Sequence, residues 1–270
     1  MKNRLAMALS SAHLRAEVLR PEKRGMRGVL RSLLGGGQTA YTPVAHIEVP
    51  MAAQQAALST LLEQAAAKLK TRHVPGLGGL RLEVQLGLEH AHLGLMVLQD
   101  GDAKSLPASA RESYAQAWVR QMLHIAPETQ VIRWQVSPDG RQLLVSCVDR
   151  NVFAALEEFA GKHGLRFASC RPAVLSAAAA GRNTGDPITV VWTEAGRDAQ
   201  RLGSVQLLRF SHGQLTGSWR GWIPVVPGGA QNDDAALEAA IRRFRAGEAA
   251  PHPDAVQRIH WPDTASGARA

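Results

Sequence analysis

The stretch RLAMALSSAHLRAEVLR (Arg4–Arg20) predicts two strands and begins the pattern that decides the fold. Leu5–Leu9 is a continuous apolar run, which is typical of a buried strand. After a serine pair, apolar and polar residues alternate over residues 14–19, as in a half-buried strand. A third apolar run, Val44–Val49, ends at a proline. The chain therefore opens with three predicted strands.

A helix follows, because the apolar period changes between Met51 and Lys70 from two residues to that of a helix. The residues on its apolar face are Leu58, Leu61, Leu62, Ala65, Ala66 and Leu69. The same order recurs late in the chain, with strands at Ile188–Trp192, Gly203–Phe210 and Gln214–Trp219 and a helix at Asp233–Gly247. No sequence repeat accompanies this order, so the two regions share topology alone.

The residues between these two regions predict mixed α/β structure. Alternation over Leu80–Leu86 and the apolar stretch Leu93–Leu98 indicate two strands, which we expect to pair with each other. Val131–Val136 and Leu143–Val148 flank a Pro-Asp-Gly turn and predict a hairpin, because proline presets φ and glycine permits a positive φ.

Two units of three strands and a helix, separated by α/β material, are the layout of the duplicated actin-like fold. We therefore predict an α/β protein with mixed sheets and two lobes, the second of them shortened. The first lobe is expected over residues 1–180, with an inserted subdomain at about 88–137, and the second over 181–250. Residues 251–270 are rich in Ala, Pro and Gly and predict a flexible tail.

Composition excludes several classes of protein. With 45% hydrophobic residues in 270, the chain can bury a real core and is not disordered. No window approaches 18 consecutive apolar residues, so no membrane span is predicted. Two cysteines make no disulfide framework, which favours a reducing cytosol. Of the net charge of +8, most lies in residues 1–31, which argues against a nucleic-acid groove across the whole surface.

The basic N-terminal segment contains a short amphipathic pattern at Gly25–Leu34. Such a helix could lie on an anionic membrane surface, or it could pack its leucines on the body and leave its arginines solvated. Late in the chain, two tryptophans could line a partner groove or pack in the core. The candidate membrane or partner contacts are Arg20, Lys23, Arg24, Arg27, Leu30, Arg31, Leu33, Leu34, Trp219 and Trp222.

The chain resembles the cytoplasmic actin-like proteins of type IV pilus and type II secretion assembly platforms. The resemblance rests on hydrophobic blocks and turns in Arg4–Arg20, Leu80–Leu98, Tyr114–Pro172 and Val205–Trp222, and it covers about residues 1–245. It implies a scaffold that is cytoplasmic, peripheral to the inner membrane, and bound to an inner-membrane-anchored assembly protein. It also implies that this partner offers a short N-terminal peptide to a groove on the body.

Some relatives of this kind bind ATP. In actin-like ATPases, the turn after the first strand of each lobe holds an Asp, which organises hydrated magnesium, and a Gly, which lets backbone N–H groups approach phosphate. The first turn here, with Ser10 and Ser11, has neither residue type, and the second places Glu194 and Gly196 in a longer loop. We therefore predict no enzyme and no cofactor. An ATPase of the same machinery is the alternative, and an adaptor that uses the basic arm on a membrane or nucleic acid is the second.

Other residue patterns have plain interpretations. His90 and His92 share a face of a predicted strand and could bind a metal, although two surface histidines are the simpler explanation of the spacing. Cys147 and Cys170 lie on strands that could be neighbours, either as a redox pair or as two small core residues. The sequence contains no Gly-x-Ser-x-Gly, Walker lysine loop, His-Glu-x-x-His or Cys-x-x-Cys motif.

Overall fold

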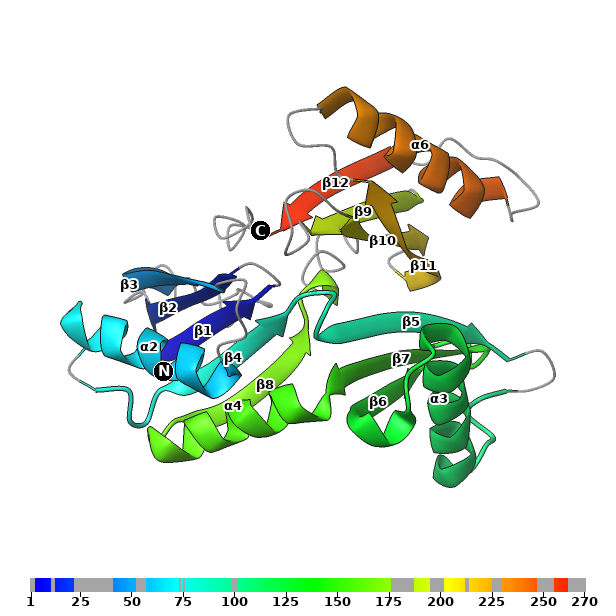
Figure 1. Cartoon of the computed structure of the whole chain (residues 1–270). Helices are drawn as coiled ribbons and strands as arrows, with labels where there is room; N and C mark the ends of the chain where they lie inside the picture. Colours follow the sequence, from blue (N-terminus) through cyan, green and yellow to red (C-terminus); the bar gives the residue numbers. More distant parts are fainter. Residues whose placement is uncertain are drawn as a thin grey trace, which may run out of the picture. The chain divides into compact units, whose positions relative to one another are not determined.

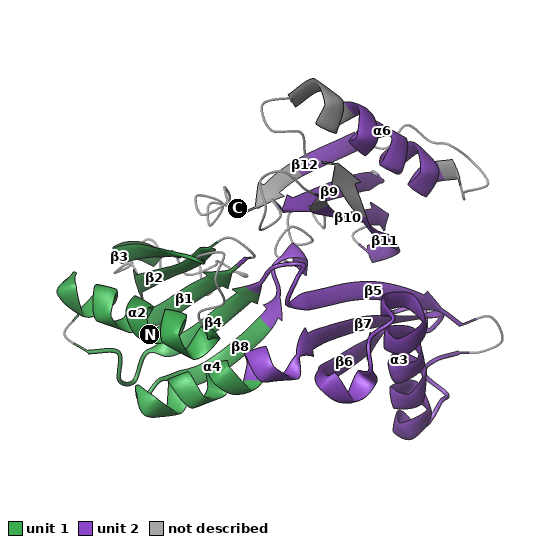
Figure 2. Cartoon of the chain, in the orientation of Figure 1, with its two compact units in different colours: residues 1–9, 13–85, 154–170 green, residues 10–12, 86–153, 171–270 purple. Residues whose placement is uncertain are grey.

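A computed structural model gives the arrangement of most of the chain (Figure 1). The described residues are 3–10, 13–21, 41–51, 57–72, 74, 76–98, 102–175, 187–194, 202–211, 214–224, 230–246 and 255–261. The chain divides into two compact units (Figure 2). Unit 1 holds residues 1–9, 13–85 and 154–170, and unit 2 holds residues 10–12, 86–153 and 171–270.

Most of unit 1 is a five-stranded sheet, here called sheet A. Its strands are β1 (Arg4–Leu9), β2 (His13–Pro21), β3 (Tyr41–Pro50), β4 (Arg81–Leu86) and β8 (Arg166–Pro172). They lie in the order β3-β2-β1-β4-β8, with β1–β2 and β2–β3 antiparallel. Burial alternates along β1 and β2, which confirms the predicted period of two residues.

Two helices belong to this sheet, and Figure 1 shows them beside its strands. Helix α2 (Leu58–Thr71) packs on β2 and β3 and buries the predicted apolar face. Helix α4 (Arg150–Lys162) buries Leu156, Phe159 and Ala160. The carboxylate of Asp149 accepts the N–H groups of the first helical turn of α4, because these groups have no partner within the helix.

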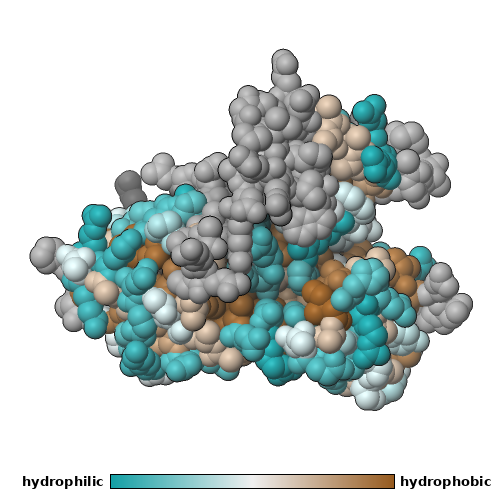
Figure 3. Space-filling view, viewed as in Figure 1, coloured by the Kyte–Doolittle hydropathy of each residue, from teal (hydrophilic) through white to brown (hydrophobic). Residues whose placement is uncertain are grey.

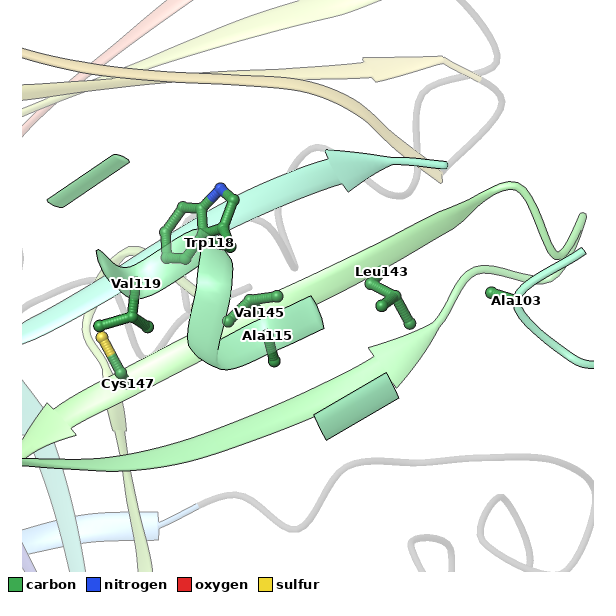
Figure 4. Close-up of a cluster of buried hydrophobic side chains, with 7 residues drawn as sticks. All are labelled: Ala103, Ala115, Trp118, Val119, Leu143, Val145 and Cys147. Atoms are coloured by element: carbon green, nitrogen blue, oxygen red, sulfur yellow. The ribbon is translucent and has the colours of Figure 1, made fainter. Parts of the chain in front are cut away.

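Unit 2 contains the three-stranded sheet B, formed by β5 (Ala91–Val97), β6 (Gln130–Val136) and β7 (Gln142–Asp149) in the order β5-β7-β6. The predicted hairpin is confirmed, since β6 and β7 are antiparallel and Gly140 has φ 79°. Helix α3 (Ala108–Leu123) and the short η1 (Pro127–Thr129) accompany this sheet. Figure 4 shows side chains of α3 and β7 that meet in its core.

Unit 2 also contains the four-stranded sheet C and helix α6 (Ala230–Ala246). The strands are β9 (Ile188–Glu194), β10 (Leu202–Ser211), β11 (Gln214–Pro224) and β12 (Ala255–Trp261), in the order β11-β10-β9-β12. The residues of α6 that pack against β9 and β10 include Leu237, Ala240 and Ile241, as the helical spacing predicts. No described helix is long and apolar enough to cross a bilayer.

Three expectations about this organisation need correction. The strands at 80–86 and 93–98 do not pair, because the turn at 88–90 carries the chain from sheet A to sheet B. Sheet B continues to Asp149, past the predicted end of the insertion, because β7 is its central strand. Within the predicted tail, residues 255–261 form β12, and α6 supplies the crossover that a parallel partner of β9 requires. The predicted division into lobes at residue 180 stays a prediction.

Candidate functional site on the polar face of sheet C

Sheet C has an apolar face and a polar face. Val205 and Leu207 of β10 point towards α6, so the intervening Gln206 lies on the opposite face. The register places Gln206 between Trp192 of β9 and Arg220 of β11. Including the nearby Glu194 and Ser218, we call these side chains the polar cluster: Trp192, Glu194, Gln206, Ser218 and Arg220.

Glu194 is a buried carboxyl group at the end of β9, with only 3% of its surface exposed. The backbone N–H of Leu88 donates to both of its oxygens, at 2.8 and 2.9 Å, and the indole N–H of Trp192 donates to Oε1 at 3.0 Å. Burial raises the pKa of Glu194 to about 7, against the opposing effect of the Trp192 and Leu88 hydrogen bonds. This carboxyl group is therefore fully engaged within the protein.

Arg220 binds the same residue through the peptide group that follows it. Its Nη2 donates to the backbone oxygen of Leu88 at 2.6 Å. Burial lowers the pKa of Arg220 to about 10, and the negative charge of Glu89 opposes this shift. Side chains of sheet C thus bind both the N–H and the C=O of Leu88.

Gln206 and Ser218 make a similar contact five residues further along the chain, at Leu93 of β5. Gln206 Nε2 donates to the backbone oxygen of Leu93 at 2.6 Å, and the hydroxyl of Ser218 is 3.5 Å from the same oxygen. Because β5 is an edge strand of sheet B, the polar cluster takes the place that a neighbouring strand would occupy. The arrangement contains donors and acceptors that hold a backbone segment.

Of the four residues suggested for nucleotide binding, the structure describes Ser10 and Glu194. Ser10 is 3% exposed and follows β1, while Ser11 and Gly196 lie outside the described residues. A hydrated magnesium ion needs carboxylate oxygens that water can reach. Both oxygens of Glu194 are instead occupied by Leu88 and Trp192. Glu194, the described carboxylate at this strand end, is therefore not presented to such an ion.

The predicted membrane or partner contacts are described only in part. Arg20 is exposed near the end of β2. Trp219 is half-buried and packs on the core beneath α6, and a Cβ at Gly221 would overlap its ring. Trp222 lies in β11, with its side chain outside the described set. The predicted contacts that fall wholly outside the described residues are Lys23, Arg24, Arg27, Leu30, Arg31, Leu33 and Leu34.

The histidine and cysteine hypotheses fare differently. His92 is a buried residue of β5, contrary to a surface position, and no three described His, Cys, Asp or Glu residues form a group that could hold a metal. Cys147 lies in β7 of sheet B and Cys170 in β8 of sheet A, so the expectation that their strands are neighbours was wrong. Both cysteines are free, and burial raises the pKa of each thiol to about 12.

A hollow lies between α2 and α4 in unit 1, with a volume of about 350 Å³. Glu63 of α2 lies 2.9 Å from Nζ of Lys162 and 3.2 Å from Nε2 of His163, and the Lys162 hydrogen bond lowers its pKa. Phe159 and Ala155 also line the hollow. Figure 3 shows mainly hydrophilic residues along the edge where Figure 1 places α4. Its mixed charges and short apolar wall make it a weaker candidate than the polar cluster.

Sequence reasoning missed most of the polar cluster. Gln206 and Arg220 lie in strands whose sequence shows only the usual alternation of apolar and polar residues. Their partners are backbone oxygens of Leu93 and Leu88, which no residue type would reveal. One signal was available: Trp192 and Glu194 are two residues apart on a strand, so they share a face. That spacing could have suggested the indole–carboxylate hydrogen bond.

Solved structures match this chain, although no family model and no curated protein matches its sequence. A Bacteroides thetaiotaomicron protein with an actin-like ATPase fold and unknown function matches with TM-score 0.55 and 11% identity, covering 96% of this chain and 82% of that one. The cytoplasmic domain of EpsL, an inner membrane component of the Vibrio cholerae type II secretion system, matches with TM-score 0.54, 11% identity and the same coverage. The PilM–PilN type IV pilus biogenesis complex matches with TM-score 0.57 and 10% identity, covering 97% and 82%.

The sequence identity in these matches is only 10–11%, so they indicate a similar chain path and not a shared activity. They extend over nearly the whole chain and include a protein described as having an actin-like ATPase fold. The predicted α/β class with mixed sheets is confirmed by sheets A, B and C. The chain therefore has the actin-like fold.

Proposed function

We propose that this protein is a non-catalytic actin-like scaffold of an inner-membrane pilus or type II secretion assembly platform. In this role it binds a membrane-anchored partner protein at the cytoplasmic side of the inner membrane. Two of its structural neighbours support the assignment, since EpsL is an inner membrane component of a secretion system and PilM occurs in a complex with PilN.

The observation that carries the non-catalytic part is the state of Glu194. Its two oxygens accept hydrogen bonds from Leu88 and Trp192 in a buried site, so they are not presented to a hydrated metal ion. The first strand of sheet A ends at Leu9 and Ser10, which supply no carboxylate. Among the residues that the structure describes at these two strand ends, none presents a carboxylate to a hydrated ion, which supports the non-catalytic role.

Thermal unfolding with and without millimolar ATP and magnesium tests this part. A ligand that binds only the native state must raise apparent stability, so we expect the melting temperature to stay within 1 °C, roughly the reproducibility of the measurement. An actin-like ATPase measured in parallel provides the positive control. A clear upward shift, or release of phosphate from ATP, would contradict the proposal.

Purification of the tagged chain from detergent-solubilised membranes of its native host tests the partner. We expect co-purification of one membrane-anchored protein in stoichiometric amount, confirmed by reconstituting the pair from separately purified components. Recovery of enzymes from a single metabolic route, with no envelope protein, would count against the assignment.

The basic segment that begins at Arg20 stays our predicted contact with an anionic membrane surface or with the partner. Flotation with liposomes of anionic or neutral lipid tests the membrane contact. We expect recovery with anionic lipid alone, and loss of recovery when residues 22–36 are deleted. Equal recovery with both lipids would remove the membrane contact and leave the partner contact.

A further inference from the structure

Sheets A and C share one strand order up to the fourth strand and then differ. In sheet A the order β3-β2-β1-β4 is followed by a fifth strand, β8. In sheet C the order β11-β10-β9-β12 ends at β12, and no other strand among the described residues pairs with it. The position that corresponds to β8 is therefore unfilled in the described part of sheet C.

The edge at β12 is long enough to pair with another strand. Seven residues, Ala255–Trp261, pair in parallel with β9. An edge strand directs its outer backbone N–H and C=O groups away from the sheet, and these groups can pair with an added strand. Ala255 is exposed and Val256 is 40% exposed, so side chains do not cover this end of the edge.

Two arginines lie where α6 meets this edge. Arg258 of β12 forms an ion pair with Glu238 of α6, so that side of α6 lies next to β12. Arg242 is one helical turn from Glu238, and its Nε is 3.4 Å from the Glu238 backbone oxygen. Arg242 and Arg258 are both exposed, so two guanidinium groups and one carboxylate lie at this border.

We propose that the outer edge of β12 binds an extended acidic segment of a partner protein, which adds to sheet C as its fifth strand. Backbone pairing supplies the geometry, and the arginines select negative charge. The inference goes beyond the scaffold function and does not depend on it, because it rests on the two sheets and the charges of β12 and α6.

Two synthetic peptides based on β8 test the proposal, since β8 fills the equivalent position in sheet A. Both contain residues 165–171 with Cys170→Ser, and the acidic peptide also carries Arg166→Glu and Arg171→Glu. We expect the acidic peptide to bind the full chain at least tenfold more tightly, on the order expected for several exposed charge contacts. Hydrogen exchange should show added protection of the amides of β12.

Two controls separate strand addition from simple charge attraction. The acidic peptide with Ala168→Pro keeps its charge but cannot complete the backbone ladder, so we expect it to give no protection. In the chain, Arg242→Glu with Arg258→Glu should reverse the preference towards the basic peptide, and Arg242→Glu alone, which keeps the ion pair of β12, should weaken it. Protection that survives the proline substitution, a preference unchanged by charge reversal, or no protection of β12 at millimolar peptide would each overturn the proposal.

Discussion

Sheets A and C have the same first four strands in the same order, but their polar faces are used differently. On sheet A, charged side chains pair with one another across strands, as in Arg4–Glu83 at 3.1 Å and His46–Glu17 at 3.0 Å, and they stay partly exposed. On sheet C, the corresponding face is buried and binds the backbone of residues 88–93. The polar face of sheet A is thus partly exposed, whereas the polar face of sheet C is buried against a backbone segment.

The two sheets also differ in the lengths of the loops that join their first three strands in chain order. In sheet A, three residues, 10–12, join the first two strands and residues 22–40 join the next two. In sheet C, residues 195–201 join the first two strands, and only residues 212–213 join the next two. The same strand order is therefore compatible with both short and long connections.

Core truncation should separate the two sheets most strongly. Leu62→Ala in α2 and Ile241→Ala in α6 each remove a buried side chain that is at most 2% exposed, and each should cost about 2–5 kcal/mol. Because the residues belong to different compact units, hydrogen exchange should accelerate mainly in sheet A for the first and in sheet C for the second. Equal acceleration of both sheets by either variant would show that they unfold as one.

The pH dependence of stability should distinguish the buried polar face from the exposed one. The pKa of Glu194 is raised from 4.5 to about 7, so the folded state holds its proton more tightly than the unfolded state does. Its contribution is therefore present below pH 4.5 and lost as the pH rises through 7, a change of about 3 kcal/mol. Relative to Glu194→Gln, the wild-type chain should lose this amount in urea unfolding between pH 4.5 and pH 8.

Glu17→Gln on sheet A is the matched control for that substitution. Glu17 is partly exposed and its pair with His46 lies at the surface, so its replacement should cost less than about 1 kcal/mol. Parallel wild-type and Glu194→Gln curves would contradict the role given to the buried carboxyl group.

These contrasts mark what the sequence could predict. Periodicity located the three strands before α2, the hairpin with Gly140, and the apolar side of α6, because each is a local pattern. Pairing partners such as those of β4 and β12 depend on contacts distant in sequence, and both were missed. The contacts of Arg220 and Gln206 were also out of reach, because a backbone oxygen as a partner leaves no trace in residue type.

A smaller effect should come from the glycine beneath Trp219. A Cβ at Gly221 would overlap the indole ring, so Gly221→Ala should force that ring to move and cost about 1–3 kcal/mol. Gly161→Ala in α4 is the matched control, because a Cβ there meets no atom within 4 Å and alanine favours the helix by about 1 kcal/mol. Thermal unfolding should show opposite shifts. Destabilisation by both variants would indicate that the packing over Gly221 is not special.

The smallest changes in the free energy of unfolding should come from two surface ion pairs, one between α2 and α4 and one between α6 and β12. Lys162→Met breaks the contact of α4 with Glu63 of α2, and Arg258→Met breaks the contact of β12 with Glu238 of α6. Both pairs are largely exposed, so each variant should cost less than about 1 kcal/mol in urea unfolding. A larger loss for Arg258→Met alone would show that β12 depends on this pair for its place in sheet C.

The insertion of sheet B between β4 and α4 has a consequence for the chain as the ribosome releases it. Sheet B can pair all of its strands once residue 149 is free, since its partners are close in sequence. Sheet A must wait for β8 after residue 166, with β1 to β4 already exposed, and sheet C must wait for β12. The middle of the nascent chain can thus be finished while its beginning still presents an incomplete sheet to chaperones.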